Sequence, residues 1–300
     1  MAKEYICVIG SLNYDIIIKQ KRLPQMGETY TADSITYSGG GKGANQAVQC
    51  AKLGYPTVMV GKVGEDSFGD KLLKNLNEYG VDCTCVKRSS LDTGVGIVHA
   101  LEDGAVYATI ITGANFDMKK QEIDELEELI KNSKVLILQL EIPVEIVEYI
   151  LDRAKAWGVY TILNAAPAKE ISREALRKVS CLIVNETEAS FYAGAEITDL
   201  AGVEANREKL EALCPGTIIV TLGAKGSVLL EQGNVTPVES VKAEYVAETT
   251  GAGDSYIGAF AYGMCKGMES GEACRFASRV SSLTVQKIGA QEGMPYFNEL

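Results

Sequence analysis

A short stretch near the carboxyl end of the chain, residues 249–256, combines two glycines with one carboxylate. It reads Thr-Thr-Gly-Ala-Gly-Asp-Ser-Tyr and leads into an apolar, helix-like run over 256–264. Backbone N–H groups at such a helix start converge on an anion, and the helix dipole favours negative charge there. Asp254 in the same turn suits a base that removes a proton from a hydroxyl beside a bound phosphate. The alternative is an ordinary glycine-rich turn in which Asp254 caps the helix.

A second glycine-rich stretch, residues 39–45, also opens a helix-like segment and reads Gly-Gly-Gly-Lys-Gly-Ala-Asn. The glycines permit close approach of the backbone to a ligand. Lys42 and Asn45 supply donors suited to a polyhydroxylated or anionic ligand. The spacing differs from that of a Walker loop, and no dinucleotide-binding Gly-x-Gly-x-x-Gly follows the first strand. The alternative is a flexible loop.

Polar residues follow several of the expected buried strands. Asn13 and Asp15 come after the first strand, and Glu141 comes after the strand 135–140. In open α/β sheets, ligands bind at the carboxyl ends of the strands, and paired acceptors and donors suit sugar hydroxyls. For Asn13 and Asp15 the alternative is an Asx turn.

Two further strand ends favour a nucleotide and its metal. Asn185 and Glu188 are three residues apart at a helix start, and they offer oxygens for Mg²⁺, directly or through water. The alternative for this pair is a capping box. The run Thr221-Leu222-Gly223-Ala224-Lys225-Gly226 follows another strand. It is expected either to line a nucleotide or to form a bare hairpin turn.

Strand-like and helix-like segments alternate along most of the chain, which predicts an α/β fold with a parallel sheet covered by helices on both faces. The expected strands are 5–9, 57–63, 135–140, 160–163, 182–184, 217–221 and 244–247. The expected helices are 43–53, 67–79, 122–131, 144–157, one from about 187, 204–213 and 256–264.

Two stretches, approximately 12–38 and 93–111, break this alternation. Each holds two strand-like runs and no helix: 15–19 and 29–37 in the first, 94–101 and 106–111 in the second. Asp103-Gly104, between the last two runs, is a hairpin turn signal. We predict a single domain over residues 1–300 in which these four strands form a small separate sheet that lies over the site as a lid.

The composition is that of a globular protein. The 300 residues are 46% hydrophobic and 23% charged, and the net charge is −11. An acidic chain argues against non-specific nucleic-acid binding, and no stretch of about 18 apolar residues indicates a membrane span. The eight scattered cysteines are expected to be reduced and mostly buried. With no signal-peptide pattern, they favour a cytoplasmic location. The single histidine, His99, excludes histidine-rich metal sites.

Taken together and in this order, the motifs resemble those of the PfkB-type carbohydrate kinases, in the ribokinase-like form of that family. The resemblance covers essentially the whole chain, and the matching stretches are 10–15, 40–47, 61–69, 185–188, 221–223 and 251–254. It implies a three-layer α/β/α domain with a small β-sheet lid. It also implies transfer of the γ-phosphate of ATP to the primary hydroxyl of a sugar, with D-ribose as the expected sugar.

The resemblance further implies a role for each matched residue. Asp254 is the expected catalytic base, with Gly251, Ala252 and Gly253 as the anion hole. The expected sugar-binding residues are Asn13, Asp15, Gly41, Lys42, Asn45, Glu141 and Asp254. The residues expected to hold ATP and its Mg²⁺ are Asn185, Glu188, Thr221, Gly223, Lys225, Gly226, Gly253 and Ser278.

A monovalent cation site, for K⁺, is implied at Glu248, Thr250, Thr284, Lys287, Gly289 and Gly293. Glu248 stands where the family usually has aspartate, and Gly293 where serine is common. Tyr14 is bulkier than the family's usual residue, and it would change the choice of sugar if it pointed into the site. The resemblance also implies a homodimer formed through the lid, with the sugar and ATP as the only other partners and no nucleic acid or membrane. Two alternatives stay open: a kinase of the same family for another sugar or a nucleoside, and a non-catalytic sugar-binding homologue.

Overall fold

The main body of the molecule is built on one large sheet. The computed structural model describes residues 4–103 and 105–300, and within them the sheet has nine strands in the order β13-β12-β11-β10-β9-β8-β1-β4-β5. Neighbouring strands from β11 to β5 are parallel, whereas β12 and β13 continue the edge in antiparallel fashion. The strands are β1 (Ile6–Ile9), β4 (Thr57–Gly64), β5 (Val81–Ser89), β8 (Val135–Gln139), β9 (Tyr160–Asn164), β10 (Cys181–Asn185), β11 (Thr217–Thr221), β12 (Ser227–Glu231) and β13 (Asn234–Val238).

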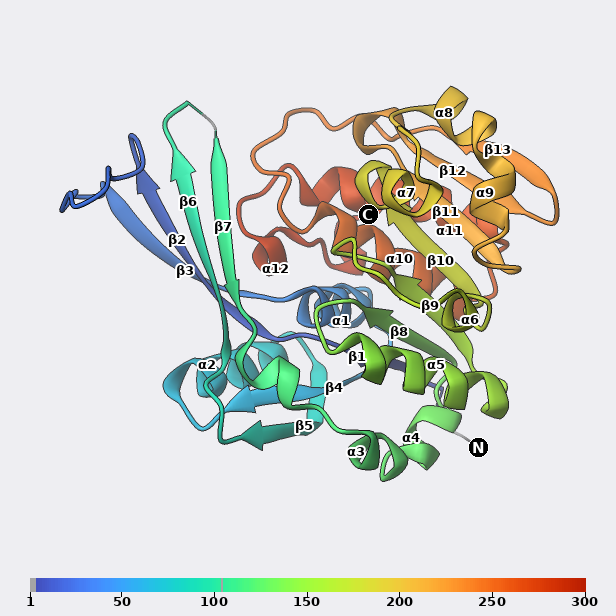
Figure 1. The fold of residues 1–300 in the computed structure, drawn as a ribbon, viewed down its shortest axis with the longest axis horizontal. Helices are drawn as coiled ribbons and strands as arrows, with labels where there is room; N and C mark the ends of the chain where they lie inside the picture. The colour runs from blue at the N-terminus through green and yellow to red at the C-terminus, as the bar shows by residue number, and fades with distance from the viewer. Residues whose placement is uncertain (1–3, 104) are drawn as a thin grey trace.

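Helices cover both faces of this sheet and give the expected three layers (Figure 1). In β1, Ile6 and Val8 face one apolar core while Cys7 and Ile9 face the other, because successive strand side chains point to opposite faces. The first core is closed by α1 (Lys42–Lys52), α2 (Ser67–Glu78), α10 (Ala252–Cys265) and α11 (Ser270–Thr284). The second is closed by α3 (Lys120–Asp124), α4 (Glu127–Lys131), α5 (Val144–Trp157), α6 (Arg173–Leu176), α7 (Glu186–Ala193), α8 (Leu200–Ala205) and α9 (Arg207–Glu211).

The predicted small sheet is present. Its strands are β2 (Asn13–Gln20), β3 (Ser34–Gly40), β6 (Gly94–Leu101) and β7 (Val106–Ile111), in the order β3-β2-β6-β7. It projects from the main body beside the ends of the central strands (Figure 1). The register places Asn13 and Asp15 on one face of β2 and Tyr14, Ile16 and Ile18 on the other. We call this sheet the lid.

Four of the expected elements differ in the structure. The strand expected over 29–37 begins only at Ser34 and continues to Gly40. The helix expected over 122–131 is two helices, α3 and α4, separated at Leu126. The helix expected over 204–213 begins earlier and breaks at Asn206, whose side chain donates to the carbonyl of Gly202 at 3.0 Å and competes with continued helix. The run 244–247 forms no strand, because the Ala247 N–H donates to the carbonyl of Val285 at 2.8 Å instead of to a neighbouring strand.

None of the helices among the described residues combines the length and apolar character needed to cross a membrane.

Candidate active site

A cavity of about 240 Å³ lies at the carboxyl ends of the central strands. Its wall combines the ends of several strands with the start of α7, the start of α10 and the first residue of α1. The lining residues are Lys42, Asn164, Ala166, Ile183, Val184, Asn185, Glu188, Thr221, Gly251, Gly253, Asp254 and Ile257. The structure therefore brings both glycine-rich stretches together with the Asn185 and Glu188 pair, although they are far apart in sequence.

The two glycines before Asp254 serve different purposes. Gly251 is the N-cap of α10 with φ of 79°, a left-handed conformation that side chains disfavour. A Cβ on Gly251 would also lie 2.9 Å from the Cα of Ala290. A Cβ on Gly253 would have no neighbour within 4 Å, so the first turn of α10 presents bare backbone to the cavity. Gly251 thus shapes the turn, and Gly253 keeps its surface open.

Asp254 is buried, with 8% of its surface exposed, and it is held from both sides. One carboxylate oxygen accepts a hydrogen bond from Asn45 Nδ2 at 2.9 Å, and the other accepts from Gln46 Nε2 at 2.8 Å. The N-cap of α10 is Gly251, without a side-chain cap, so the alternative of Asp254 as a simple cap is wrong. Burial raises the pKa of Asp254, opposed by the charge of Lys42 and by the two amide donors.

A network of buried amides holds those two donors in place. Gln46 Oε1 accepts from Gln139 Nε2 at 2.7 Å, and Gln46 Nε2 also reaches Asn164 Oδ1 at 3.3 Å. Asn45 Oδ1 accepts from Gln291 Nε2 at 3.0 Å. The carboxylate of Asp254 is therefore oriented before any ligand arrives.

Sequence reasoning did not find Gln46, Gln139, Asn164 or Gln291. For two of them a signal exists. Gln139 and Asn164 are the last residues of β8 and β9, just as Asn185 and Thr221 end β10 and β11. A polar residue closing each of several successive apolar strands indicates the ligand-binding edge of a parallel sheet.

Lys42 and Glu141 lie close to Asp254. Glu141 Oε2 accepts from Ser11 Oγ at 2.6 Å and from the backbone N–H of Lys42 at 3.1 Å. Burial disfavours the charged Lys42 ammonium, but the carboxylates of Asp254, Glu141 and Glu188 outweigh it and raise the pKa of Lys42. One cation is thus surrounded by three carboxylates.

Asp15 reaches this group from the lid. A Cβ on Gly40 would lie 2.1 Å from Asp15 Oδ2, and a Cβ on Gly96 would lie 2.3 Å from Oδ1, so the carboxylate occupies a slot between two glycines. Burial, followed by the charges of Glu141 and Asp254, raises the pKa of Asp15 to about 6.

The other residues near the start of the lid have defined contacts. Asn13 is buried and accepts from Asn115 Nδ2 at 2.8 Å. A Cβ on Gly41 would lie 2.7 Å from the backbone N of Asn13. Tyr14 faces away from the site and stacks on Phe68, with ring centroids 4.5 Å apart. Tyr14 therefore points away from Asn13 and Asp15 and does not line the cavity.

The Asn185 and Glu188 pair forms the capping box that was left open as an alternative. Glu188 N–H donates to Asn185 Oδ1 at 2.9 Å, and Asn185 N–H donates to Glu188 Oε2 at 2.8 Å. Both residues nevertheless line the cavity. Glu188 Oε1 makes no hydrogen bond to the described residues, and burial raises the pKa of Glu188 against the pull of the Asn185 N–H and Lys42. An anionic oxygen left free at the cavity fits a hydrated Mg²⁺.

The other residues expected near the nucleotide are placed less centrally. Thr221 lines the cavity, whereas Gly223, Lys225, Gly226 and Ser278 are not among its lining residues. Lys225 lies in the short turn η2 (Gly223–Lys225) and donates to the carbonyl of Thr198 at 2.9 Å. Ser278 is buried on α11.

The residues expected to hold a monovalent cation meet beside the Gly251 turn. A Cβ on Gly293 would lie 3.2 Å from the carbonyl oxygen of Thr284 and 3.4 Å from that of Lys287, so the glycine leaves a small hollow edged by carbonyls. Glu248 Oε2 accepts from the backbone N–H of Gly289 at 2.9 Å. Thr250 directly precedes the turn.

This oxygen-only donor set suits a hard cation such as K⁺. Within the described parts of the chain, no three histidine, cysteine or acidic side chains gather into a metal site.

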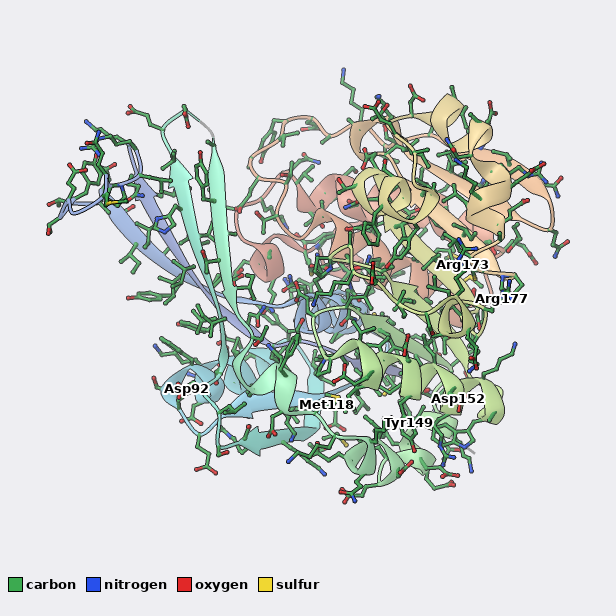
Figure 2. The ribbon with its side chains drawn as sticks, viewed as in Figure 1. Asp92, Met118, Tyr149, Asp152, Arg173 and Arg177 are labelled. Carbon is green, nitrogen blue, oxygen red and sulfur yellow. The ribbon has the colours of Figure 1, made fainter. Side chains whose placement is uncertain are left out.

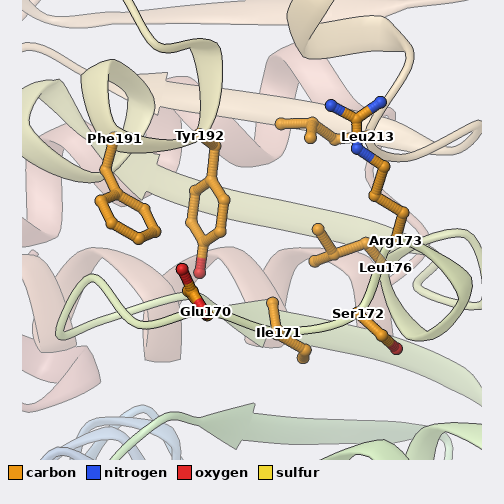
Figure 3. A pocket seen from close by; sticks show the side chains of 8 residues that line it. All are labelled: Glu170, Ile171, Ser172, Arg173, Leu176, Phe191, Tyr192 and Leu213. Atoms are coloured by element: carbon orange, nitrogen blue, oxygen red, sulfur yellow. The ribbon is translucent and has the colours of Figure 1, made fainter.

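A larger cavity, of about 490 Å³, lies beside the C-terminal half of α7 (Figure 3). Its wall is formed by Glu170, Ile171, Ser172, Arg173, Leu176, Phe191, Tyr192 and Leu213. Arg173 and Arg177 mark this end of the molecule, remote from the lid (Figure 2). None of the predicted site residues lines this hollow, so size does not identify the site here; the convergence of Asp254, Lys42 and Glu188 does.

The comparisons with known proteins agree with this geometry. Residues 3–296 match the sequence profile described as pfkB family carbohydrate kinase. The chain is 37% identical to the ribokinase of Bacillus subtilis, covering 98% of this chain and 97% of the relative. It is 32% identical to the deoxyribokinase of Salmonella typhimurium, with 98% and 97% covered.

Solved structures give the same result. The structure of Arabidopsis thaliana ribokinase complexed with ribose and ATP superimposes with a TM-score of 0.91 at 35% identity, covering 99% of this chain and 97% of that one. The fold, the converging residues and the full-length similarity lead to one conclusion: the chain belongs to the pfkB family of carbohydrate kinases.

Proposed function

We propose that residues 1–300 form one kinase domain that transfers the γ-phosphate of ATP to the primary hydroxyl of D-ribose. The observation that carries this proposal is Asp254, a buried carboxylate fixed by Asn45 and Gln46 at the open first turn of α10. Full-length similarity to ribokinases supports the choice of sugar.

In this reaction Asp254 accepts the proton of the primary hydroxyl. The freed oxygen forms a bond to the γ-phosphorus, the bond from that phosphorus to the bridging oxygen breaks, and ADP leaves. Backbone N–H groups of Gly251 and Gly253 stabilise the charge on the transferred group, an effect worth roughly 3 kcal/mol for one such donor. The Ala252 N–H donates to the Thr249 carbonyl at 3.2 Å and joins them only by leaving that partner. The lid excludes water, which would otherwise hydrolyse ATP.

The sugar is held between the lid and the main body. Asp15 and Glu141 accept from its hydroxyls, and Lys42 and Asn13 donate to them. Gly41 allows the backbone to approach the sugar closely, while Asn45 contributes mainly by orienting Asp254. The remaining nucleotide residues, Thr221, Gly223, Lys225, Gly226 and Ser278, belong to the wall toward the base of ATP.

Two cations complete this proposal. Asn185 and Glu188 would hold a hydrated Mg²⁺, which would neutralise phosphate charge when bound. K⁺ would be held at a second site by Glu248, Thr250, Thr284, Lys287, Gly289 and Gly293. A cation there compensates the carbonyl oxygens beside the turn that carries Gly251.

A turnover assay with ATP and a panel of pentoses, hexoses and nucleosides tests the function. We expect D-ribose to give the highest kcat/KM and 2-deoxyribose to be at least about tenfold worse, because a site that hydrogen-bonds a hydroxyl rejects an analogue lacking it. A preference for deoxyribose, a hexose or a nucleoside would overturn the choice of sugar but leave the kinase. No turnover with any of them, despite sugar binding by calorimetry, would favour the non-catalytic homologue.

We also propose that two copies of the chain pair through the outer face of the lid, the face without Asp15. That face carries Ile35, Tyr37, Tyr107 and Ile111, each 45–53% exposed, next to Ile16 and Ile18. An exposed apolar sheet face of this kind is typical of a protein–protein contact. The same apolar side chains on a second copy of the chain would pack against it. Ile35→Lys together with Tyr37→Lys should convert a dimer to monomer in sedimentation, and a wild-type monomer would refute the pairing.

A further inference from the structure

Asn115 occupies the point where the chain leaves the lid. It lies in the short turn η1 (Gly113–Asp117), directly after β7, and only 2% of its surface is exposed. Its partners, Leu12 and Asn13, lie where the chain enters the lid from β1. The sequence reasoning assigned Asn115 no role, and the mechanism above does not use it.

The side-chain amide of Asn115 pairs with the backbone of Leu12 in a way that fixes its orientation. Oδ1 accepts from the Leu12 N–H at 2.9 Å, and Nδ2 donates to the Leu12 carbonyl at 3.1 Å. Oxygen and nitrogen of an amide side chain are usually hard to distinguish. Here the backbone decides, because a peptide N–H only donates and a carbonyl only accepts.

The orientation of Asn13 follows from that of Asn115. The second N–H of Asn115 Nδ2 points at Asn13 Oδ1, 2.8 Å away. Oδ1 of Asn13 is therefore the atom turned inward, and Nδ2 is turned toward the face of β2 that carries Asp15. Among the described residues, the only buried side-chain polar atoms without a partner are Gln139 Oε1 and Arg153 Nε. Asn13 Nδ2 makes no hydrogen bond to the described residues and is not one of these fully buried atoms, so part of its surface is accessible to a ligand.

Gly94 leaves the room for this arrangement. A Cβ there would lie 2.3 Å from Asn115 Nδ2 and 2.4 Å from Asn13 Oδ1, so any side chain would force the two amides apart.

We infer that Asn115 is a positioning residue for sugar specificity: it sets the amide of Asn13 so that a donor, not an acceptor, meets a sugar hydroxyl. This inference rests on the proposed function, in which Asn13 contacts the sugar. A donor that is fixed in advance requires an acceptor on the sugar and rejects analogues that lack one.

Asn115→Asp reverses the arrangement at almost constant shape. Aspartate still accepts from the Leu12 N–H, but its second oxygen now faces two acceptors, Asn13 Oδ1 and the Leu12 carbonyl oxygen. The lost bond to the Leu12 carbonyl lowers stability, which a thermal melt measures, and only the Asn13 amide is free to turn. The Asn13 amide then turns over and presents Oδ1 to the sugar. We expect the KM for D-ribose to rise about tenfold, equivalent to about 1.4 kcal/mol, with kcat and the KM for ATP within about twofold of wild type.

A double-mutant cycle separates positioning from a general structural role. In an Asn13→Ala background, Asn115→Asp should add less than about twofold to the sugar KM, because the group it orients is gone. An additive increase, or an equal rise in the KM for ATP, would overturn the inference. If Asn115→Asp does not fold, Gly94→Ala is used instead, because its methyl group separates Asn115 Nδ2 from Asn13 Oδ1. The same rise in the KM for D-ribose is expected. Asn132→Asp, an exposed amide on the far side of the body, is the matched control.

Fluorinated sugars supply a readout that a structural role would not change. Fluorine accepts but does not donate, so wild type should tolerate fluorine at the hydroxyl that Asn13 Nδ2 contacts. Asn115→Asp should lose that analogue selectively; equal losses for all positions would count against the inference. If wild type turns over a different sugar, the proposed ribose function fails, and the cycle is run with that sugar. If it turns over none, calorimetric sugar affinities replace KM throughout.

Discussion

The two carboxylates that meet across the site, Asp254 and Asp15, are held in opposite ways. Asp254 belongs to the main body and accepts one hydrogen bond on each oxygen, from Asn45 and Gln46. Asp15 belongs to the lid and accepts no hydrogen bond from the described residues; two glycines merely leave it space. A group whose oxygens are already partnered is oriented in advance. A group whose oxygens are free is waiting for donors from a ligand.

The body around Asp254 is fully packed, whereas the lid around Asp15 is packed on one side only. The body buries both faces of its sheet under helices, whereas the lid exposes large apolar side chains on its outer face. The body therefore holds the reacting groups in a fixed orientation. In our proposal the polar groups of the lid gain their hydrogen-bond partners when the sugar binds, and its outer face is covered by a second copy of the chain. The predictions below test this division.

Removing the charge of the oriented group should have the largest effect. Asp254→Asn keeps the size of the side chain but cannot take a proton, and general base catalysis contributes about 10²–10⁴-fold. We expect kcat to fall by at least about 10² with little change in the sugar KM. Steady-state kinetics on a variant with unchanged circular dichroism checks this. Retention of more than about a third of the turnover would show that Asp254 is not the base.

The two glycines beside Asp254 should fail in different ways. A Cβ at residue 253 has no neighbour within 4 Å outside its own helix, so Gly253→Val should fold normally. It should nevertheless lose most of its transfer activity, because the side chain fills the space for the phosphoryl group. Gly251→Ala should instead lose about 1–2 kcal/mol of stability, because its φ is positive and Ala290 is in the way. Thermal melts and kcat measured on both variants test this. Normal turnover by a well-folded Gly253→Val would remove the anion hole from the mechanism.

Changes at Asp15, the carboxylate without partners, should affect the kinetics toward the sugar and their pH dependence, but not the KM for ATP. Asp15→Asn should raise the sugar KM about tenfold, because one of the two acceptor oxygens is replaced by a donor NH₂ group. The ATP KM should stay constant. The pKa of Asp15 is raised to about 6, so wild-type kcat/KM for sugar should fall as the pH drops through about 6. In Asp15→Asn this step should be absent. A parallel rise in both KM values would mean that Asp15 is structural.

The same shift has a consequence for stability. The native state binds the Asp15 proton more tightly than the unfolded chain, whose pKa is near 3.8. Native stability therefore declines as the pH rises from about 4 to about 6. Asp15→Asn removes that loss, so the variant should melt higher than wild type at pH 8 and show a smaller difference, or none, at pH 4. A lower melting temperature at pH 8 would contradict the idea that Asp15 is held without partners.

This comparison also explains how much the sequence could reveal. Asp254, Lys42 and Glu188 could be found because they lie in short motifs whose glycines and spacing carry a chemical meaning. Gln291 and Asn115 could not, because each acts through hydrogen bonds to residues that lie 246 positions away for Gln291 and 102 or 103 positions away for Asn115. A single glutamine or asparagine in a chain carries no signal of a distant partner.

The fold shows the same limit. Strands β6, β7 and β11 and helix α5 were predicted to the residue, because apolar runs ending in Gly or Asp-Gly define them. Helix α11 was missed, since it buries alanines and serines instead of large apolar side chains. Strand β5 was missed because polar residues interrupt it at the sheet edge.

The smallest effect should come from Lys52, which is two contacts removed from Asp254 through Gln291 and Asn45. This lysine is 4% exposed, and its ammonium donates to the carbonyls of Gln291 at 2.7 Å and Met294 at 2.9 Å. It thereby fixes the segment from which Gln291 reaches Asn45. Lys52→Met leaves those carbonyls unpaired, at about 1–3 kcal/mol for each buried group. We expect the melting temperature to fall by several degrees.

Loosening Gln291 should also weaken the hold on Asn45, one step removed from Asp254. We expect kcat to fall about threefold, equivalent to about 0.7 kcal/mol in the barrier. The sugar KM should change less than in Asp15→Asn, because the Lys52 ammonium bonds to residues 291–294 and not to the lid itself. Lys74→Met, on the exposed surface of α2, is the matched control and should change neither quantity. If Lys52→Met raised the sugar KM as strongly as Asp15→Asn does, the lid and the body would be parts of one coupled unit, and the division drawn above would be wrong.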